Sequence, residues 1–264
     1  MLDLKNVSKT FFPNTPNERK ALVDINLHLA PGDFVTIIGG NGAGKSTLFN
    51  SIAGSFLIDR GNILLDGKNI TFLRDYQRAR TIGRLFQDPL KGTAPNMTIE
   101  ENLAMAYLRG MRKGVHFGIS KKDSDFFREQ LSELGLGLED RLKTKMGLLS
   151  GGQRQAVTLM MATIVTPKLL LLDEHTAALD PATAEKVAEL TQKIVARGSI
   201  TTMMITHNMQ QSLDCGNRTI MMDNGRIILD LQGDARSKLT VPDLLELFKD
   251  RSHKAFDNDR MMLS

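Results

Sequence analysis

The chain has 264 residues, of which 41 % are hydrophobic and 24 % are charged, and its formal net charge is +4. This composition is ordinary for a globular protein with a sizeable core, and so small a charge indicates an evenly solvated surface. A single cysteine, Cys215, excludes a disulfide framework and a cysteine-pair metal site. The N-terminus lacks a signal-peptide pattern and no run of about 18 apolar residues occurs, so we expect a cytoplasmic protein.

The N-terminal segment predicts strands that lead into a glycine-rich loop. Residues 2–29 are expected to form strands around the polar loop Pro13–Lys20, and Phe34–Ile38 has the composition of a buried strand. A helix is expected over Thr47–Ala53 and a hairpin over Asn62–Ile70. The order strand, glycine-rich loop, helix is typical of a phosphate-binding fold.

The middle of the chain is richer in helices. Thr98 and Glu101 form a capping-box pattern at the start of a helix that is expected to end at Gly110. Residues 111–148 are polar and are expected to form a distinct helical subdomain. A further helix is expected to begin near Gly152.

The C-terminal half predicts further buried strands. Lys168–Asp173 and Ile200–Thr206 read as strands of a parallel sheet, and Asp223–Gly225 as the turn of a hairpin. Val241–Phe248 is expected to form a short amphipathic helix. Three methionine pairs fall in segments that read as buried and are expected to fill the core: Met160-Met161, Met203-Met204 and Met221-Met222.

The glycine-rich loop fits a known template. Gly39-Gly40-Asn41-Gly42-Ala43-Gly44-Lys45-Ser46 matches G-x-x-x-x-G-K-[ST], the P-loop, whose backbone N–H groups wrap a nucleotide's phosphates. Lys45 is expected to reach the β- and γ-phosphates, Ser46 to offer its hydroxyl to Mg²⁺, and Thr47 to continue the binding segment. The sequence therefore predicts nucleotide binding.

Several polar residues follow predicted strands, where ligands of a parallel sheet gather. Asp173 is placed to hold hydrated Mg²⁺, and Glu174 to orient or deprotonate an attacking water. His207 follows the next strand as a candidate γ-phosphate sensor. Gln87, at a strand-to-loop junction, could bind Mg²⁺ or position water, although an exposed loop glutamine is the default interpretation.

A second anion-binding pattern occurs far from the P-loop. Ser150-Gly151-Gly152-Gln153 places a good N-cap and two glycines at a helix start, where the helix dipole favours negative charge. A plain capped helix is the alternative. One nucleotide does not need two such sites from one subunit, so the pattern suggests a site shared between two copies of the chain.

Taken in order, these motifs resemble the nucleotide-binding subunit of an ATP-binding-cassette (ABC) ATPase, from Leu2 to about Asp230. Gly39–Ser46 resembles the family's Walker A motif, Leu149–Gln153 its signature and Leu169–Asp173 its Walker B motif. The resemblance implies roles for single residues: Glu174 as catalytic carboxylate, Gln87 in the Q-loop, Asp180 in the D-loop and His207 as switch histidine. Phe11 falls where the family has an aromatic residue that stacks on adenine, with Phe12 as an alternative.

The resemblance also implies an architecture. It predicts an α/β P-loop NTPase fold with a mostly parallel core sheet, an N-terminal antiparallel β subdomain and an inserted helical subdomain. Within one domain over residues 1–264, the core would occupy 1–90 and 165–230, the helical subdomain 91–164, and a C-terminal extension 231–264.

In function, the resemblance implies an ATP-hydrolysing motor that needs ATP and Mg²⁺. Two copies would dimerise head to tail, with Ser150 of one facing the γ-phosphate at Lys45 of the other. The helical subdomain and the Gln87–Thr98 loop would dock onto a membrane permease, so that the protein works peripherally at the cytoplasmic face. The pattern is similar to amino-acid importers, which implies an extracellular solute-binding protein and no nucleic-acid partner.

Two departures and two alternatives accompany this resemblance. His175 stands where the family commonly has proline, and Ala177 where it commonly has serine. A soluble cassette ATPase acting on nucleic acid or ribosomes is one alternative, disfavoured by the single P-loop and the lack of heptads. A cluster-assembly scaffold without a permease is the other.

Overall fold

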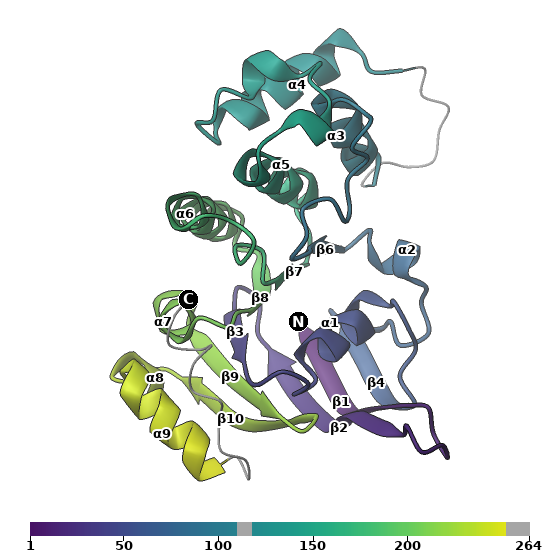
Figure 1. Cartoon of the computed structure of the whole chain (residues 1–264). Coiled ribbons are helices and arrows are strands. Elements are labelled where there is room, and N and C mark those ends of the chain that lie inside the picture. The colour runs from purple at the N-terminus through teal and green to yellow at the C-terminus, as the bar shows by residue number, and fades with distance from the viewer. Residues whose placement is uncertain (110–117, 252–264) are drawn as a thin grey trace. The chain divides into compact units, whose positions relative to one another are not determined.

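The computed structural model describes residues 1–109 and 118–251, and the chain divides into two compact units. Unit 1 comprises Met1–Arg78 and the described residues from Ile200 onward, and unit 2 comprises Ala79–Ser199 (Figure 1). The bounds predicted for the core, helical subdomain and extension stay a prediction. Across the described ranges, none of the helices combines the length and apolar character needed to cross a bilayer.

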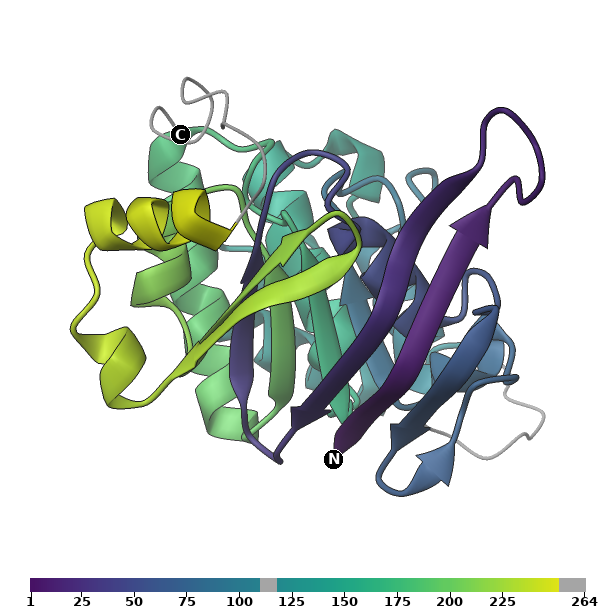
Figure 2. The same cartoon turned by 90° about the horizontal axis from the view of Figure 1, so that it is seen from below.

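Unit 1 contains an antiparallel sheet in the order β2-β1-β4-β5 (Figure 2). Its strands are β1 (Leu2–Phe11), β2 (Arg19–Leu29), β4 (Arg60–Leu65) and β5 (Lys68–Asn69). The loop predicted over Pro13–Lys20 is shorter than expected, because Phe11 pairs with Arg19 and the ladder extends into the loop. The predicted antiparallel N-terminal region is confirmed.

Unit 1 also contains parallel strands that carry the P-loop. Strand β3 (Phe34–Ile38) lies between β8 (Thr201–Ile205) and β9 (Arg218–Asp223) and runs parallel to both. All residues of β3 and β8 are buried, as apolar runs predicted. Strand β10 (Arg226–Gln232) completes the predicted late hairpin with β9.

The helices of unit 1 lie around these strands. Their bounds are α1 Lys45–Ala53, α2 Asp75–Arg78, α7 Met209–Asp214, α8 Asp234–Ser237 and α9 Val241–Arg251. The amphipathic helix predicted over Val241–Phe248 is confirmed as α9. Its Leu244 and Phe248 belong to the same buried cluster as Ile38 at the end of β3 and Met209 at the start of α7.

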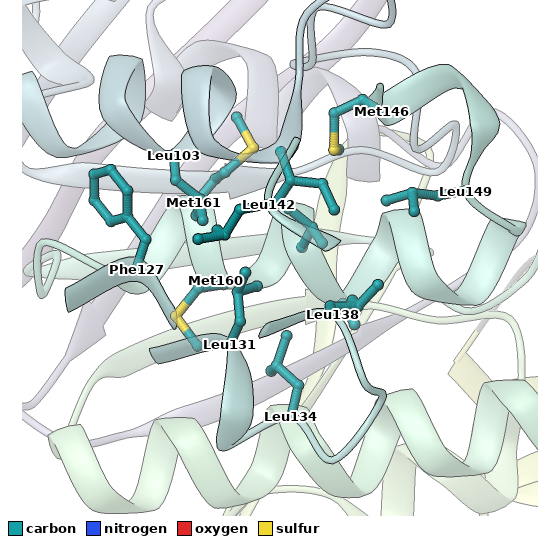
Figure 3. Packing of buried hydrophobic residues seen from close by; sticks show 13 residues of the cluster. Leu103, Phe127, Leu131, Leu134, Leu138, Leu142, Met146, Leu149, Met160 and Met161 are labelled. Atoms are coloured by element: carbon teal, nitrogen blue, oxygen red, sulfur yellow. The ribbon is translucent and has the colours of Figure 1, made fainter. Parts of the chain in front are cut away.

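Unit 2 combines two parallel strands with helices. Strands β6 (Ile82–Leu85) and β7 (Leu169–Asp173) pair in register, with Leu85 opposite Leu172. The α-helices are α3 Ile99–Leu108, α4 Lys121–Ser132, α5 Gly151–Thr163 and α6 Pro181–Gly198, with short 3₁₀ turns at Glu139–Arg141 and Met146–Leu148. Their apolar side chains form one core, in which Leu103, Phe127 and Met160 are buried (Figure 3).

Local sequence signals explain where these helices begin. Thr98 and Glu101 form the predicted capping box at α3, in which the backbone N–H of Thr98 donates to Glu101 over 2.7 Å. Ser120 caps α4 in the same way. The expected helix end at Gly110 lies outside the described residues. The three methionine pairs are buried, so their predicted role in the core is confirmed.

Candidate functional site

The P-loop of unit 1 depends on close backbone approach. Gly39, Gly42 and Gly44 adopt positive φ angles of 148°, 81° and 105°. A Cβ atom on Gly39 would collide with the carbonyl oxygen of Met222, and one on Gly44 would lie 2.6 Å from that of Ala21. Contact and conformation therefore both require glycine in this loop.

Helix α1 begins at the end of this loop without a side-chain cap. Gly44 is the N-cap residue and has no side chain to bond the first-turn N–H groups. Unbonded N–H groups and the positive end of the helix dipole attract phosphate. Asn41 and Ser46 are exposed in the same segment, whereas Ala43 is buried and Thr47 is half-buried. The loop thus fits the phosphate chain of a nucleotide.

Two cationic side chains lie on the loop. The ammonium group of Lys45 donates to the carbonyl oxygens of Gly39 and Gly40, over 2.7 and 3.1 Å. Arg19 Nη2 donates to the carbonyl oxygen of Gly42 over 3.0 Å. Lys45 was predicted from the P-loop template, whereas Arg19 was not, because Arg19 lies outside the motif and reaches the loop from strand β2.

The two candidate adenine-stacking residues have different surroundings in unit 1. The ring of Phe11 packs edge-on against Phe56, with 5.3 Å between centroids. Phe12 is 67 % exposed and has a positive φ of 52°. Adenine stacking by Phe11, and the alternative through Phe12, stay predictions.

His207 lies between β8 and α7, as predicted. It is half-buried directly after Thr206, whose hydroxyl accepts a hydrogen bond from the N–H of Asn208 over 3.1 Å. Asn208 in turn caps α7 by accepting from Gln211 N–H over 2.8 Å. Hydrogen bonds therefore constrain the backbone on both sides of His207.

In unit 2, Asp173 ends strand β7 and has a cation beside it. Arg84, on β6, places Nη2 3.6 Å from Asp173 Oδ2, and both side chains are largely buried. The Arg84 guanidinium also lies over the ring of Phe86, 4.4 Å from its centroid. Burial lowers the pKa of Arg84, while the charge of Asp173 opposes that shift. No motif in the sequence indicated a role for Arg84.

Glu174 and His175 follow β7 in a tight turn. Glu174 has a φ of 47°, which is rare for a residue with a side chain, and its carbonyl oxygen accepts from Ala177 N–H over 3.0 Å. His175, which replaces the common proline, is buried, and its Nε2 lies 3.1 Å from the hydroxyl of Thr191. Burial lowers the pKa of His175 to about 4, so this imidazole is neutral.

Asp180 ends the same segment and caps α6. Its carboxylate accepts a hydrogen bond from Thr183 N–H over 3.1 Å. Bonding to Thr183 holds the pKa of Asp180 below its ordinary value. A capping role is thus observed, and the D-loop role of Asp180 stays a prediction.

Gln87 lies two residues beyond β6 and is exposed. The strand-to-loop position is as expected from the sequence. Its binding of Mg²⁺ or water stays a prediction.

The signature residues start helix α5. The hydroxyl of Ser150 accepts from Gln153 N–H, and the Gln153 side chain accepts from Ser150 N–H, both over 3.3 Å. Ser150 and Gly151 are exposed, whereas Gly152 packs so closely against Thr183 that a Cβ atom would collide with its methyl group. The capping box is therefore structural, and a role of Ser150–Gln153 in binding a second copy's nucleotide stays a prediction.

The donor set of the candidate residues fits Mg²⁺. Ser46 offers a hydroxyl at the start of α1, and Asp173 a carboxylate at the end of β7, and oxygen is the donor that Mg²⁺ prefers. In residues 1–109 and 118–251, no group of three or more histidine, cysteine, aspartate and glutamate side chains could hold a metal ion.

Comparison with known proteins identifies the family. Residues 22–177 match the family model described as ABC transporter. The chain is 43 % identical over 250 residues to a tyrosine transport ATP-binding protein of Clostridioides difficile (strain R20291), covering 94 % of this chain and 99 % of that protein. The chain belongs to the ABC transporter family.

Other proteins that are similar to this chain support the same family assignment. It is 34 % identical over 253 residues to the methionine import ATP-binding protein MetN of Streptococcus agalactiae serotype III (strain NEM316), covering 91 % of this chain and 68 % of MetN. Among solved structures, a dimeric post-hydrolysis cassette, MJ0796 bound to ADP and Pi, matches with a TM-score of 0.76 and 29 % identity. That match covers 88 % of this chain and 98 % of the other.

These findings confirm the predicted family and fold. The protein is an ABC ATPase that binds ATP and hydrolyses it to power transport. The residues assigned from the sequence lie at strand ends, loops and helix starts, as expected, with Lys45 and His207 in unit 1 and Gln87, Ser150 and Glu174 in unit 2.

Proposed function

We propose that this cassette is the motor subunit of an amino-acid importer, acting at the cytoplasmic face of a membrane through a permease. The observation that carries the proposal is the 43 % identity to a tyrosine transport ATP-binding protein across almost the full length of both chains. A match to methionine import proteins supports the same substrate class. An extracellular solute-binding protein would deliver the amino acid to the permease.

The proposed chemistry assigns nucleotide binding to the P-loop. Backbone N–H groups of Gly39–Ser46 and the ammonium group of Lys45 would hold the phosphates. When nucleotide binds, Lys45 would exchange its hydrogen bonds to the carbonyl oxygens of Gly39 and Gly40 for contacts with the phosphates. Ser46, Gln87 and Asp173 would hold Mg²⁺, which when bound neutralises charge on the phosphates. The adenine would stack on Phe11.

Hydrolysis is assigned to Glu174. Its carboxylate would orient and deprotonate the attacking water. The left-handed backbone of Glu174 is held by the hydrogen bond from Ala177 N–H to its carbonyl oxygen. His207 would contact the γ-phosphate. Asp180 and the loop before it would report the state of this site to a second copy.

Two copies of the cassette would close around ATP. The exposed Ser150 and Gly151 at the start of α5 provide a capped helix end for the γ-phosphate held by the partner copy. The dimeric form of the solved relative supports this arrangement. Closure driven by ATP binding and reopening by hydrolysis would move the permease.

Unit 2 offers a surface for the permease. Leu90, in the loop after Gln87, and Met105 and Leu108, on α3, are each more than two-fifths exposed. A cavity of about 600 Å³ is lined by α3 residues that include Met105 and Leu108. Exposed apolar side chains beside a cavity are typical of a docking surface.

Replacing Glu174 with glutamine tests the motor assignment. We expect the variant to bind ATP as the native protein does, to lose most hydrolysis and to accumulate as an ATP-dependent dimer in gel filtration. Lys45→Ala should instead abolish ATP binding, and Ser150→Arg should leave binding intact but block dimer formation. Normal turnover by Glu174→Gln would refute the assigned role.

Uptake tests the substrate class. In a host lacking this gene, uptake of labelled tyrosine or methionine should fall and be restored by the native gene but not by Glu174→Gln. Unchanged uptake of every amino acid tried would contradict the importer assignment. The two alternatives, action on nucleic acid and cluster assembly, have no counterpart in the relatives described above, whose names describe transport.

A further inference from the structure

The guanidinium group of Arg84 lies next to Asp173, the carboxylate to which the proposed function assigns Mg²⁺. Register places Arg84 of β6 opposite Leu171 of β7, so Arg84 and Asp173 lie on the same face of the paired strands, two residues apart. Arg84 Nη2 is 3.6 Å from Asp173 Oδ2. The pairing of the two strands therefore fixes this ion pair.

Both side chains of this ion pair are largely buried, so each charge depends on the other for compensation. The side chains of Arg84 and Asp173 are only 14 % and 16 % exposed. A carboxylate so far removed from water is unfavourable unless a cation compensates it. Arg84 is a cation that compensates this carboxylate.

The geometry of the pair permits exchange. The distance of 3.6 Å between Arg84 Nη2 and Asp173 Oδ2 is longer than an ordinary N–H···O hydrogen bond, so this contact is mainly an attraction between charges. Arg84 also has a second partner, because its guanidinium lies 4.4 Å from the ring centroid of Phe86. It can therefore remain held when Asp173 takes another cation.

We propose that Arg84 is the resident counter-ion of Asp173 and competes with Mg²⁺ for this carboxylate. The inference rests on the proposed role of Asp173. A bare metal ion must overcome repulsion by Arg84, whereas a metal that arrives with ATP brings the compensating charge of the phosphates. Arg84 thereby makes metal binding at Asp173 depend on nucleotide, and it is a positioning residue rather than a catalytic one.

Metal affinity, measured apart from turnover, tests this role. Binding of Mn²⁺ to the full chain is titrated by electron paramagnetic resonance, first without nucleotide and then with a saturating non-hydrolysable ATP analogue. Without nucleotide, Arg84→Met should bind Mn²⁺ about 3- to 10-fold more tightly than the native protein, the range of a partly buried ion pair, and the gain should be smaller with the analogue bound. Arg80→Met removes the same charge from an exposed side chain of the same segment and should leave the affinity unchanged.

Two further variants separate the role of Arg84 from folding defects and from the role of Asp173. If Arg84→Met does not fold, Arg84→Gln removes the charge while keeping a polar side chain, and the same gain in affinity is expected. Asp173→Asn should weaken Mn²⁺ binding, and adding Arg84→Met to it should have no further effect. An Arg84 variant that binds Mn²⁺ equally or more weakly, while Asp173→Asn is impaired, would overturn the competition alone. Native-like binding by Asp173→Asn would instead overturn the role of Asp173 on which it rests.

Discussion

The imidazole of His175 shares a buried hydrogen bond with Thr191. His175 Nε2 lies 3.1 Å from Thr191 Oγ1, and that hydroxyl also contacts the carbonyl oxygen of Val187 over 2.8 Å. A hydroxyl has a single proton, so donation to Val187 leaves its oxygen to accept from His175. His175 is therefore a neutral imidazole with its proton on Nε2, and it fastens the turn after Glu174 to helix α6.

Folding stability should depend on pH through His175. Burial lowers its folded pKa to about 4, whereas an unfolded histidine titrates near 6.5. As pH falls from 6.5 to 4, the unfolded chain gains a proton that the folded chain excludes, so the free energy of unfolding should fall by about 3 kcal/mol. Below pH 4 this contribution becomes constant.

Denaturant unfolding of the native protein and of His175→Gln measures this effect. Glutamine can still donate to Thr191 but does not titrate, so the difference in stability between the two proteins should shrink as pH falls from 6.5 to 4. A constant difference across that range would show that His175 is not buried as a neutral group.

We expect close packing within unit 2 to leave no room for a side chain at Gly152, the second glycine of the predicted signature. A Cβ atom at this position would collide with the methyl group of Thr183 on α6. Gly152→Ala should therefore destabilise the protein by about 1–3 kcal/mol, despite the better helix propensity of alanine. Thr183→Ser removes only the methyl group, and combined with Gly152→Ala it should recover most of the loss in thermal unfolding.

The same pair of variants separates structure from function. If the double variant regains stability but not ATP-driven dimerisation, Gly152 has a role in the partner's nucleotide site besides packing. If Gly152→Ala alone is as stable as the native protein, the close contact with Thr183 does not limit this position.

Arg78 should be a structural support of the P-loop helix. It is 1 % exposed, and its guanidinium donates to the carbonyl oxygens of Ser51 and Ile52 at the end of α1, over 2.7 and 2.8 Å. Arg78→Met would leave these buried carbonyl groups without donors, at a cost of about 3–5 kcal/mol in unfolding free energy. Arg74→Met, at an exposed arginine on the same segment, should change stability by less than about 0.5 kcal/mol. Equal effects of both variants would contradict the support role.

Much of the fold could be predicted because turn residues and caps delimit its elements. The run Phe34–Ile38 and the template ending at Ser46 predicted the strand, loop and helix of the nucleotide site, and Thr98 with Glu101 predicted the start of α3. These signals are local, since each depends on residues a few positions apart. The late hairpin around Asn224 was predicted for the same reason.

The contacts that support the site could not be predicted in this way. Arg84 meets Asp173 only through the pairing of β6 with β7, and no local pattern reveals which strands pair. Arg78 lies in a polar, charged segment whose sequence predicts exposure. In the structure it is buried, and its guanidinium donates to carbonyl oxygens of α1. The sequence showed that His175 departs from the family pattern, but its burial depends on packing against α6.

Gln155, on helix α5, combines complete burial with an unsatisfied amide. It is 0 % exposed, and neither its Oε1 nor its Nε2 has a hydrogen-bond partner in the part of the chain that the structure describes. Each such group costs about 1–3 kcal/mol, so Gln155→Met, which keeps the volume, should raise the unfolding free energy by about 1–3 kcal/mol. Gln130→Met, on half-buried α4 surface, is the control and should have little effect. If Gln155→Met is less stable than the native protein, buried water satisfies the amide and the prediction is wrong. If the variant is more stable but has reduced ATPase activity, the cassette retains the amide for function.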